Sequence, residues 1–199
     1  MSELYWIPNV TTPAAADPLE AADVRSHLHI DGTDHDTDLT AMIAAATALA
    51  QDYLGQQLIN ATFEVIGRRF PLASDHPDYA IELPVGPIQS ITSIGYTDGN
   101  GDAQTVDADD YALLDDRDPP LIVPTYSVTW PWARPQLDAV TVTLVAGYGT
   151  AGSDVPEKIL HAIKFMVAEL FRNREATNAQ LLTVPVRNLL DACRGGRLP

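Results

Sequence analysis

The sequence predicts an α+β fold, in which a small bundle of helices is interrupted by an antiparallel β-sheet or sandwich. Three observations lead to this prediction. Apolar residues recur with helical spacing within residues 34–54, and they do so again within residues 156–175. Between these two stretches, residues 57–150 contain short segments rich in β-branched and aromatic residues, separated by turn-forming residues.

The first helix is expected over residues 18–28. Asp17 suits the N-cap position, Pro18 suits the first helical position, and Glu20 stands where a capping box places an acid. Residues 1–16 are short of helix signals and carry prolines, so we expect them to be extended. Three apolar residues near the start of the chain are expected to dock on the folded part: Tyr5, Trp6 and Ile7.

The second helix is expected over residues 34–54. Its apolar stripe follows the i, i+3, i+4, i+7 pattern, and its alanines favour helix and close packing. Gly55 is expected to end it in a left-handed C-cap. The stripe consists of Leu39, Met42, Ile43, Ala46, Leu49, Ala50 and Tyr53.

The middle of the chain is expected to form antiparallel strands rather than βαβ units, because the segments are short and turns separate them. Residues 140–146 alternate strictly between apolar and polar positions, which is typical of a strand with one buried face. Residues 98–101, Asp-Gly-Asn-Gly, are typical of a hairpin turn. The expected strand segments are TFEVIGRRF, YAIEL, ITSIGYTD, YALLD, YSVTW and AVTVTLVAG.

A third helix is expected over residues 156–175, with Asp154 as a cap candidate before Pro156. A linker and a short helix within residues 185–194 are expected to follow. The chain is thus expected to be a single protein with four parts, which are a helical hairpin at 17–56, a β-rich insertion at 57–150, a third helix within 154–176 and an extended C-terminal segment at 177–199.

The charge is strongly negative and unevenly distributed. Twenty-seven acids against twelve Lys and Arg residues give a net charge of −15. This argues against a general affinity for nucleic acid, because neutralising phosphates needs Lys and Arg. Residues 151–199 differ from the rest, with seven bases and five acids. A basic end on an acidic body is typical of a segment that meets a separate partner.

Several classes of protein are disfavoured by simple features. Cys193 is the one cysteine, so no internal disulfide and no oxidising compartment are implied. The N-terminus lacks the basic and apolar regions of a signal peptide. No apolar run is long enough for a membrane span, and we expect no membrane association.

Residues 26–38, SHLHIDGTDHDTD, raise the question of a metal site. On a helix, His27 and His29 would point about 200° apart, so they would not chelate one ion. A calcium loop that began at residue 31 would have its glycine second and Met42 in the twelfth position, both wrong for an EF-hand. We therefore interpret the stretch as a turn between two helices, with Thr33 or Asp34 as the helix cap. The candidate ligands were His27, His29, Asp31, Asp34, His35, Asp36 and Asp38.

No enzyme motif stands out elsewhere. The acid-rich run 107–118 allows a carboxylate pair, but such runs are usually solvated. Residues 147–152, GYGTAG, lack the lysine and the spacing of a phosphate loop. Trp130 and Trp132 allow a ligand platform, although Trp-Pro-Trp at a strand end is more often a core plug or an interface. We expect no catalysis, no catalytic, cofactor-binding or metal-ligating residues, and no cofactor.

Three stretches together resemble the tailed-phage head–tail connector proteins, also called adaptor or head-completion proteins, including those of gene transfer agents. The first resembles the family's N-terminal helical hairpin. The second resembles its strand, Ala-Gly-Tyr-Gly turn, Val-Pro and helix ending in Asn-Arg-Glu. The third resembles its terminal segment. They are DVRSHLHIDGTDHDTDLTAMIAAATALAQDYLGQQL, VTLVAGYGTAGSDVPEKILHAIKFMVAELFRNRE and VPVRNLLDACR, within residues 17–60 and 139–195.

The resemblance implies a structural subunit of a phage or phage-like particle. Connectors form a ring, usually of twelve copies, under the portal protein at the head–tail junction. The ring extends the DNA channel, binds a tail-side stopper or tail-terminator protein, and lets DNA pass without specific binding. Assembly in the bacterial cytoplasm would precede incorporation into the virion. By analogy, the C-terminal segment contacts the portal, with four expected contact residues: Arg187, Leu189, Leu190 and Arg194.

Alternative functions remain open at this point. One is a tail-completion or neck protein of another type. Another is an enzyme, with the acids of 107–118 or a metal held by His27. The last is a carbohydrate- or ligand-binding module, for which a deep pocket beside Trp130 and Trp132 would be supporting evidence.

Overall fold

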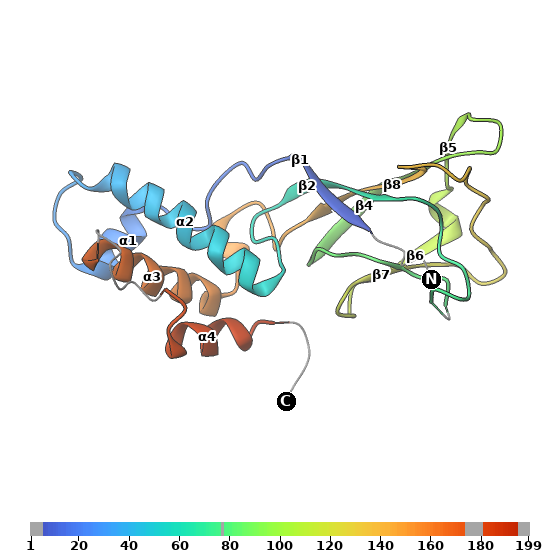
Figure 1. Cartoon of the computed structure of the whole chain (residues 1–199). Coiled ribbons are helices and arrows are strands. Elements are labelled where there is room, and N and C mark those ends of the chain that lie inside the picture. The colour runs from blue at the N-terminus through green and yellow to red at the C-terminus, as the bar shows by residue number, and fades with distance from the viewer. Residues whose placement is uncertain (1–5, 77, 174–180, 195–199) are drawn as a thin grey trace. The chain divides into compact units, whose positions relative to one another are not determined.

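The computed structural model contains helices and antiparallel sheets, which confirms the predicted α+β class (Figure 1). It describes residues 6–76, 78–173 and 181–194. The chain divides into two compact units. The β unit consists of Met1–Ala14 and Asn60–Tyr148, and the helical unit consists of Ala15–Ile59 and Gly149–Pro199.

The β unit contains two antiparallel sheets. The larger sheet has the order β1-β2-β8-β4-β5 and the smaller one has the order β3-β7-β6. Turns, two longer loops (residues 68–80 and 125–139) and the 3₁₀ helix η1 (Ala108–Asp110) join the strands. The strands are β1 (Ile7–Thr12), β2 (Ala61–Gly67), β3 (Ile81–Glu82), β4 (Ile88–Thr97), β5 (Ala103–Thr105), β6 (Tyr111–Leu114), β7 (Leu121–Pro124) and β8 (Val140–Ala146).

Strand β8 lies at the centre of the larger sheet and confirms the predicted alternation. Its residues alternate strictly between buried and half-buried positions, and so do those of its neighbour β2. Phe63 pairs with Leu144, and Val65 with Val142, so the buried side chains of both strands share one face. That face packs against Ile122 and other residues of the smaller sheet in one apolar core. The β unit is therefore a small sandwich.

The predicted hairpin turn at residues 98–101 is also present, and hydrogen bonds to the Asp98 side chain stabilise it. It joins β4 to β5, and the Gly101 N–H donates to the Asp98 carbonyl oxygen at 3.0 Å. The Asp98 carboxylate accepts hydrogen bonds from the backbone N–H groups of Asn100, Gly101 and Asp102. These bonds lower the pKa of Asp98, with the bond from Asp102 as the largest cause.

The helical unit is built from α1 (Ala21–Leu28), α2 (Asp36–Leu54), the 3₁₀ helix η2 (Gly152–Asp154), α3 (Glu157–Arg172) and α4 (Val184–Asp191). Helix α3 contacts each of the other three α-helices (Figure 1). Gly55 ends α2 in the left-handed conformation, with φ 67°, as expected. The fully buried side chains of this unit include Leu39, Ile43, Ile159, Ile163, Met166 and Leu190.

The predicted helix caps were wrong in detail. Glu20, not Asp17, is the N-cap of α1, because the Asp23 carboxylate accepts the Glu20 N–H at 3.0 Å. Helix α2 begins after His35 rather than after Thr33 or Asp34. Helix α3 begins at Glu157, with Pro156 as its N-cap, and residues 174–176 of the predicted third helix lie outside the described residues.

Two strand predictions also need correction. Residues 126–130, YSVTW, are not a strand, because Tyr126 and Ser127 form a turn in which the Val128 N–H donates to Thr125. Strand β7, which follows the Asp-Pro-Pro run, was not predicted. Residues 6–12 were expected to be extended, and they contain the edge strand β1, paired with β2. The Trp6 ring occupies the space above Gly67, where a Cβ atom would lie 2.4 Å from it.

A salt bridge fixes the loop after β2. Arg69 and Asp75 form two hydrogen bonds, of 2.5 and 3.0 Å, and the Asp75 carboxylate also accepts the Leu72 N–H at 2.7 Å. The hydrogen bond from Arg69 is the largest cause that lowers the pKa of Asp75, from the ordinary 3.8 to about 2.

We expect Asp75→Asn to lower the melting temperature of the β unit by a few degrees at pH 7. Because the folded pKa of Asp75 is depressed, its stabilisation is present above about pH 4 and is lost as the pH falls through about 2. The difference between wild type and variant should therefore shrink over that interval. Thermal denaturation followed at several pH values measures it. Asp116→Asn is the control, because Asp116 lies 3.7 Å from Arg117 and both side chains are mostly exposed. An equal loss in both variants would contradict the assignment.

We expect Gly152→Ala to destabilise the helical unit by about 1–3 kcal/mol. A Cβ atom at Gly152 would lie 2.1 Å from the carbonyl oxygen of Pro18, which is backbone and cannot rotate away. Gly95→Ala is the control, because its Cβ would meet only ordinary contacts at 3.8 and 3.9 Å. Chemical denaturation followed by circular dichroism compares the two, and equal stabilities would contradict the close approach.

Candidate functional site

The four expected portal-contact residues lie on α4 or within three residues of its end, and they differ in exposure. Val186 and Leu190, four residues apart, are buried against the rest of the helical unit. Leu189 is half-buried, and Arg187 and Arg194 are exposed. In this structure Leu190 is thus a core residue, because the amphipathic helix turns its apolar face inward. Residues 177–180 and 195–199 of the expected C-terminal segment lie outside the described residues.

Two contacts fix the end of α4 to α2. The Tyr53 hydroxyl donates to the Asp191 carboxylate at 2.8 Å, and the Arg194 guanidinium lies 5.6 Å from the centre of the Tyr53 ring. The hydrogen bond to Asp191 raises the pKa of Tyr53. Sequence reasoning placed Tyr53 in an apolar stripe and missed this role, since its partner lies 138 residues away.

The exposed side of α4 carries positive charge. The Arg187 Nε donates to the Leu182 carbonyl oxygen at 2.8 Å, which orients its guanidinium. Cys193 is half-buried beside this surface, and burial raises the pKa of its thiol. A protonated thiol is a poor nucleophile, so Cys193 is suited to packing rather than to chemistry.

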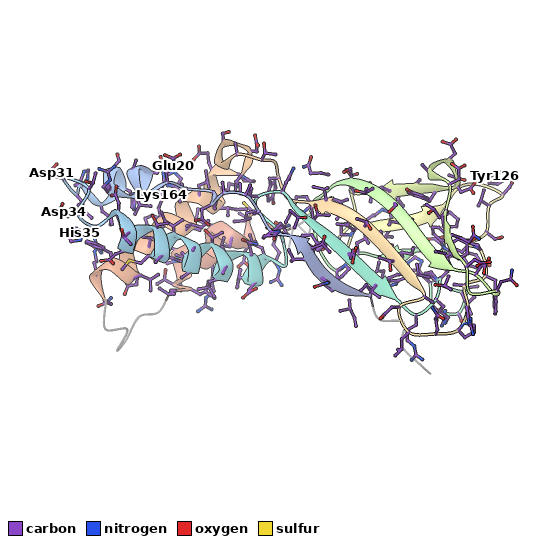
Figure 2. All side chains as sticks on the ribbon, turned by 90° about the horizontal axis from the view of Figure 1, so that it is seen from above. Glu20, Asp31, Asp34, His35, Tyr126 and Lys164 are labelled. Atoms are coloured by element: carbon purple, nitrogen blue, oxygen red, sulfur yellow. The ribbon has the colours of Figure 1, made fainter. Side chains whose placement is uncertain are left out.

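The histidine- and aspartate-rich stretch forms the turn between α1 and α2, as interpreted from the sequence. His29 ends α1 with φ 54°, and Gly32 has φ 78°. Arg25 holds the turn, because its Nη1 donates to the Gly32 carbonyl oxygen at 2.9 Å and its Nε lies 3.0 Å from the Asp36 carboxylate. This role of Arg25 was not predicted. Figure 2 shows Asp31, Asp34 and His35 at this turn.

The histidines of the turn point to different phenylalanine rings. His27 packs edge-on against Phe165, with ring centres 5.7 Å apart, and His35 packs against Phe171 at 5.5 Å. Burial, followed by the nearby charge of Lys164, lowers the pKa of His27. Within the described residues, no group of three or more His, Cys, Asp or Glu side chains is placed to hold a metal ion.

Two acids of residues 107–118 have local structural contacts. The Asp107 carboxylate accepts the Asp109 N–H at 3.1 Å and caps η1. Asp116 pairs with the neighbouring Arg117 on the surface. Asp107 and Asp116 therefore have structural contacts in the segments between β5 and β7.

The two tryptophans of the Trp-Pro-Trp run have different environments. Trp130 stacks on the buried Phe70 ring at 5.0 Å, and its indole N–H donates to the Tyr79 carbonyl oxygen at 2.6 Å. Trp132 is 66% exposed. A groove of about 1410 Å³ lies beside them, bounded mainly by apolar side chains, with Arg68 and Asp138 among its charged residues. We name it the Trp132 groove and define it by Ile7, Leu72, Tyr79, Trp132 and Leu137.

Comparison with known proteins agrees with the resemblance seen in the sequence. Residues 20–105 match the family of phage gp6-like head-tail connector proteins. This match includes most of the helical hairpin and part of the β unit, whereas the Ala-Gly-Tyr-Gly and terminal motifs lie outside it. No curated protein matches the chain. No helix in the described part of the chain is long and apolar enough to cross a bilayer.

Solved structures with the same fold come from gene transfer agent particles. A chain in the neck of an empty particle, computed with C6 symmetry, has a TM-score of 0.79 and 22% identity. A chain in the virion of a native particle has a TM-score of 0.77, and one in the neck of a native particle with C12 symmetry has 0.72, both at 22% identity. Each comparison covers 97% of both chains. Residues 20–105 thus resemble phage gp6-like head–tail connector proteins, and the fold is similar to that of these particle chains along nearly the whole length of the chain.

Proposed function

We propose that this chain is a structural head–tail connector (adaptor) subunit at the head–tail junction of a phage or phage-like gene transfer particle. The family match over residues 20–105 is the observation that carries the proposal. Twelve copies would form a ring under the portal protein, extend the DNA channel, and present a surface to a tail-side stopper or terminator. The C6 and C12 symmetries of the similar neck structures support a ring of this kind.

The exposed side of α4 is the surface we propose for the portal. Val186 and Leu190 hold the helix in the unit, and Tyr53 holds its end, so Arg187 and Arg194 project from a fixed support. Leu189 adds an apolar contact between them. Leu190 would meet the portal only after α4 had left the helical unit.

The acidity of the chain has a proposed role in DNA passage. The β unit holds fourteen acids and four bases, so a ring multiplies a large negative charge. Like charge keeps DNA from adhering to a wall that it must pass.

We expect the double variant Arg187→Glu, Arg194→Glu to bind a portal ring at least about ten-fold more weakly than wild type, because rim charges steer and hold protein partners. Both side chains are exposed, so the fold should persist. Sedimentation and electron microscopy with the portal protein of the same particle measure the effect. Arg117→Glu, an exposed charge reversal between β6 and β7, is the matched control. Equal binding by both variants would place the portal contact elsewhere, and no binding by wild type would overturn the connector proposal.

We expect the portal-bound ring to retain no double-stranded DNA in a filter or mobility assay, even at low salt. Proteins that bind phosphates lose affinity steeply as salt rises, so binding at low salt that fades with salt would reveal a basic lumen. That outcome would contradict the proposed role of the acids. The isolated chain, without the portal, is the control for contacts that arise only on assembly.

A further inference from the structure

The Trp132 groove is an apolar surface without a described occupant. Four of its side chains are unusually exposed for their type: Ile7 at 63%, Leu72 at 54%, Trp132 at 66% and Leu137 at 70%. Single exposed apolar residues are common, but a contiguous set beside a groove marks an interaction site. Rigid loops form the groove. The Arg69–Asp75 pair fixes Leu72, and Trp130 stacks beneath on Phe70.

An unpaired arginine lies at the edge of the groove, although the β unit is acidic and Asp138 also lines the groove. Of the unit's four arginines, Arg69 is paired with Asp75 and Arg117 with Asp116. The other two are Arg68, which bounds the groove, and Arg134, which does not line it and whose guanidinium lies beside Gly101. Both are exposed, and neither side chain has a hydrogen-bond or ion-pair partner in the described part of the chain. An occupant with both apolar and acidic side chains would complement the apolar groove and Arg68.

The same unit displays a projection with that chemistry. Tyr126 is 99% exposed at the tip of a turn formed by residues 125–128, which we name the Tyr126 turn. Thr125 is hydrogen-bonded to the carbonyl oxygens of Asp109 and Asp110, so two carboxylate-bearing residues lie beside the turn. Figure 2 shows the blue strand β1, which begins at the groove, along one edge of the β unit and Tyr126 on the opposite side.

Backbone strain is concentrated at these two surfaces. Three non-glycine residues of the described β unit have a left-handed backbone, namely Tyr79 with φ 55°, Ser127 with φ 69° and Asp138 with φ 55°. Tyr79 and Asp138 line the groove, and Ser127 follows Tyr126. Such conformations cost free energy and persist where the surroundings or a function require them.

We propose that the Trp132 groove of one copy receives the Tyr126 turn of the next copy, as the repeated contact of the ring. The inference rests on the proposed connector function, which requires a ring. Rings are built from heterologous contacts, in which two different surfaces of one chain meet. The groove and the turn are two such surfaces, apolar and basic on one side, aromatic and acidic on the other. The partner is therefore a second copy of this chain.

Cross-linking on the portal tests the contact directly. Cys193→Ser removes the native thiol, and Gln136→Cys at the groove and Ser127→Cys beside Tyr126 are introduced into separate chains. Both positions are exposed, and both leave Tyr126 and the apolar groove residues intact. The two chains are mixed, assembled on the portal ring and treated with a short thiol–thiol cross-linker. We expect dimers from the mixture, because each chain carries one thiol, and no cross-linked product from either chain alone.

Two substitutions supply a second readout. Tyr126→Ala should lower the number of copies per portal ring, seen by electron microscopy, while single copies still bind, since α4 is unchanged. Val10→Ala is the matched control, because Val10 is a half-exposed apolar residue of β1 in the same unit that does not line the groove. Arg68→Glu should weaken ring formation about ten-fold, and adding Asp109→Arg should restore it if the two charges meet.

The outcomes separate this inference from the connector proposal. The groove contact would be overturned if wild type formed complete rings, the two cysteine variants gave no cross-linked dimers, and Tyr126→Ala assembled normally. The connector function would then remain intact. In that case the groove would be free to bind a tail-side protein. Failure of wild type to assemble on the portal would overturn both proposals. Cross-links together with loss of rings in Tyr126→Ala would establish the contact.

Discussion

The pairing of β8 with β2 on one side and β4 on the other is the interaction on which the β unit depends. Every strand of the larger sheet is joined through it, since β1 pairs only with β2, and β5 only with β4. The four inward residues of β8 are fully buried, and burying side chains of this size contributes roughly 1.5–3 kcal/mol for each of the larger ones. β8 is followed by Gly147, which has φ 140°. A Cβ there would lie 2.6 Å from the Asn60 backbone, so this position requires glycine.

The helical unit and the β unit differ in where they carry their charged residues. The helical unit holds an amphipathic C-terminal helix in place by burying one side of it, and the arginines remain on the other side. The β unit keeps most of its acids at turns, where several of them cap the backbone, and it places the unpaired Arg68 beside an apolar groove. Each unit thus combines a core of periodically spaced apolar residues with one surface that carries arginine on a strongly acidic chain. These surfaces are the exposed side of α4 and the Trp132 groove.

The local patterns were sufficient for much of the fold. Strict alternation identified β8, Gly55 identified the end of α2, and Asp98 with two glycines identified a hairpin turn. Strand β7 was missed because Pro119 and Pro120 precede it and Pro124 is its last residue, and prolines are typical of turns. Residues 126–130 have the composition of a strand, but they lack a partner strand and turn instead. A composition rich in β-branched and aromatic residues is compatible with a strand, but a strand forms only where a neighbouring strand is available for pairing.

The functional surfaces were harder to foresee because they combine distant parts of the chain. The motifs at 17–60 and 139–195 were enough to indicate a head–tail connector. However, the Trp132 groove is lined by residues near positions 7, 70 and 135, and no local sequence pattern predicts that these segments lie together. The same holds for Tyr53 and Asp191. Burial of Leu190 likewise depends on where α4 packs, and a helical period alone does not say whether an apolar side chain faces its own protein or a partner.

The two ends of the middle segment lie next to each other, which has an evolutionary consequence. Ala61 and Ala146 are paired neighbours in the sheet, so the chain enters and leaves the span 60–148 at nearly the same point. A segment with adjacent ends can be lengthened, shortened or exchanged by recombination while the flanking helices keep their connection. β1 restricts this freedom, because it lies at the start of the chain and pairs only with β2. Loss of the segment would leave the first strand without a partner, so the start and the middle of this sequence are expected to be gained, lost and altered together.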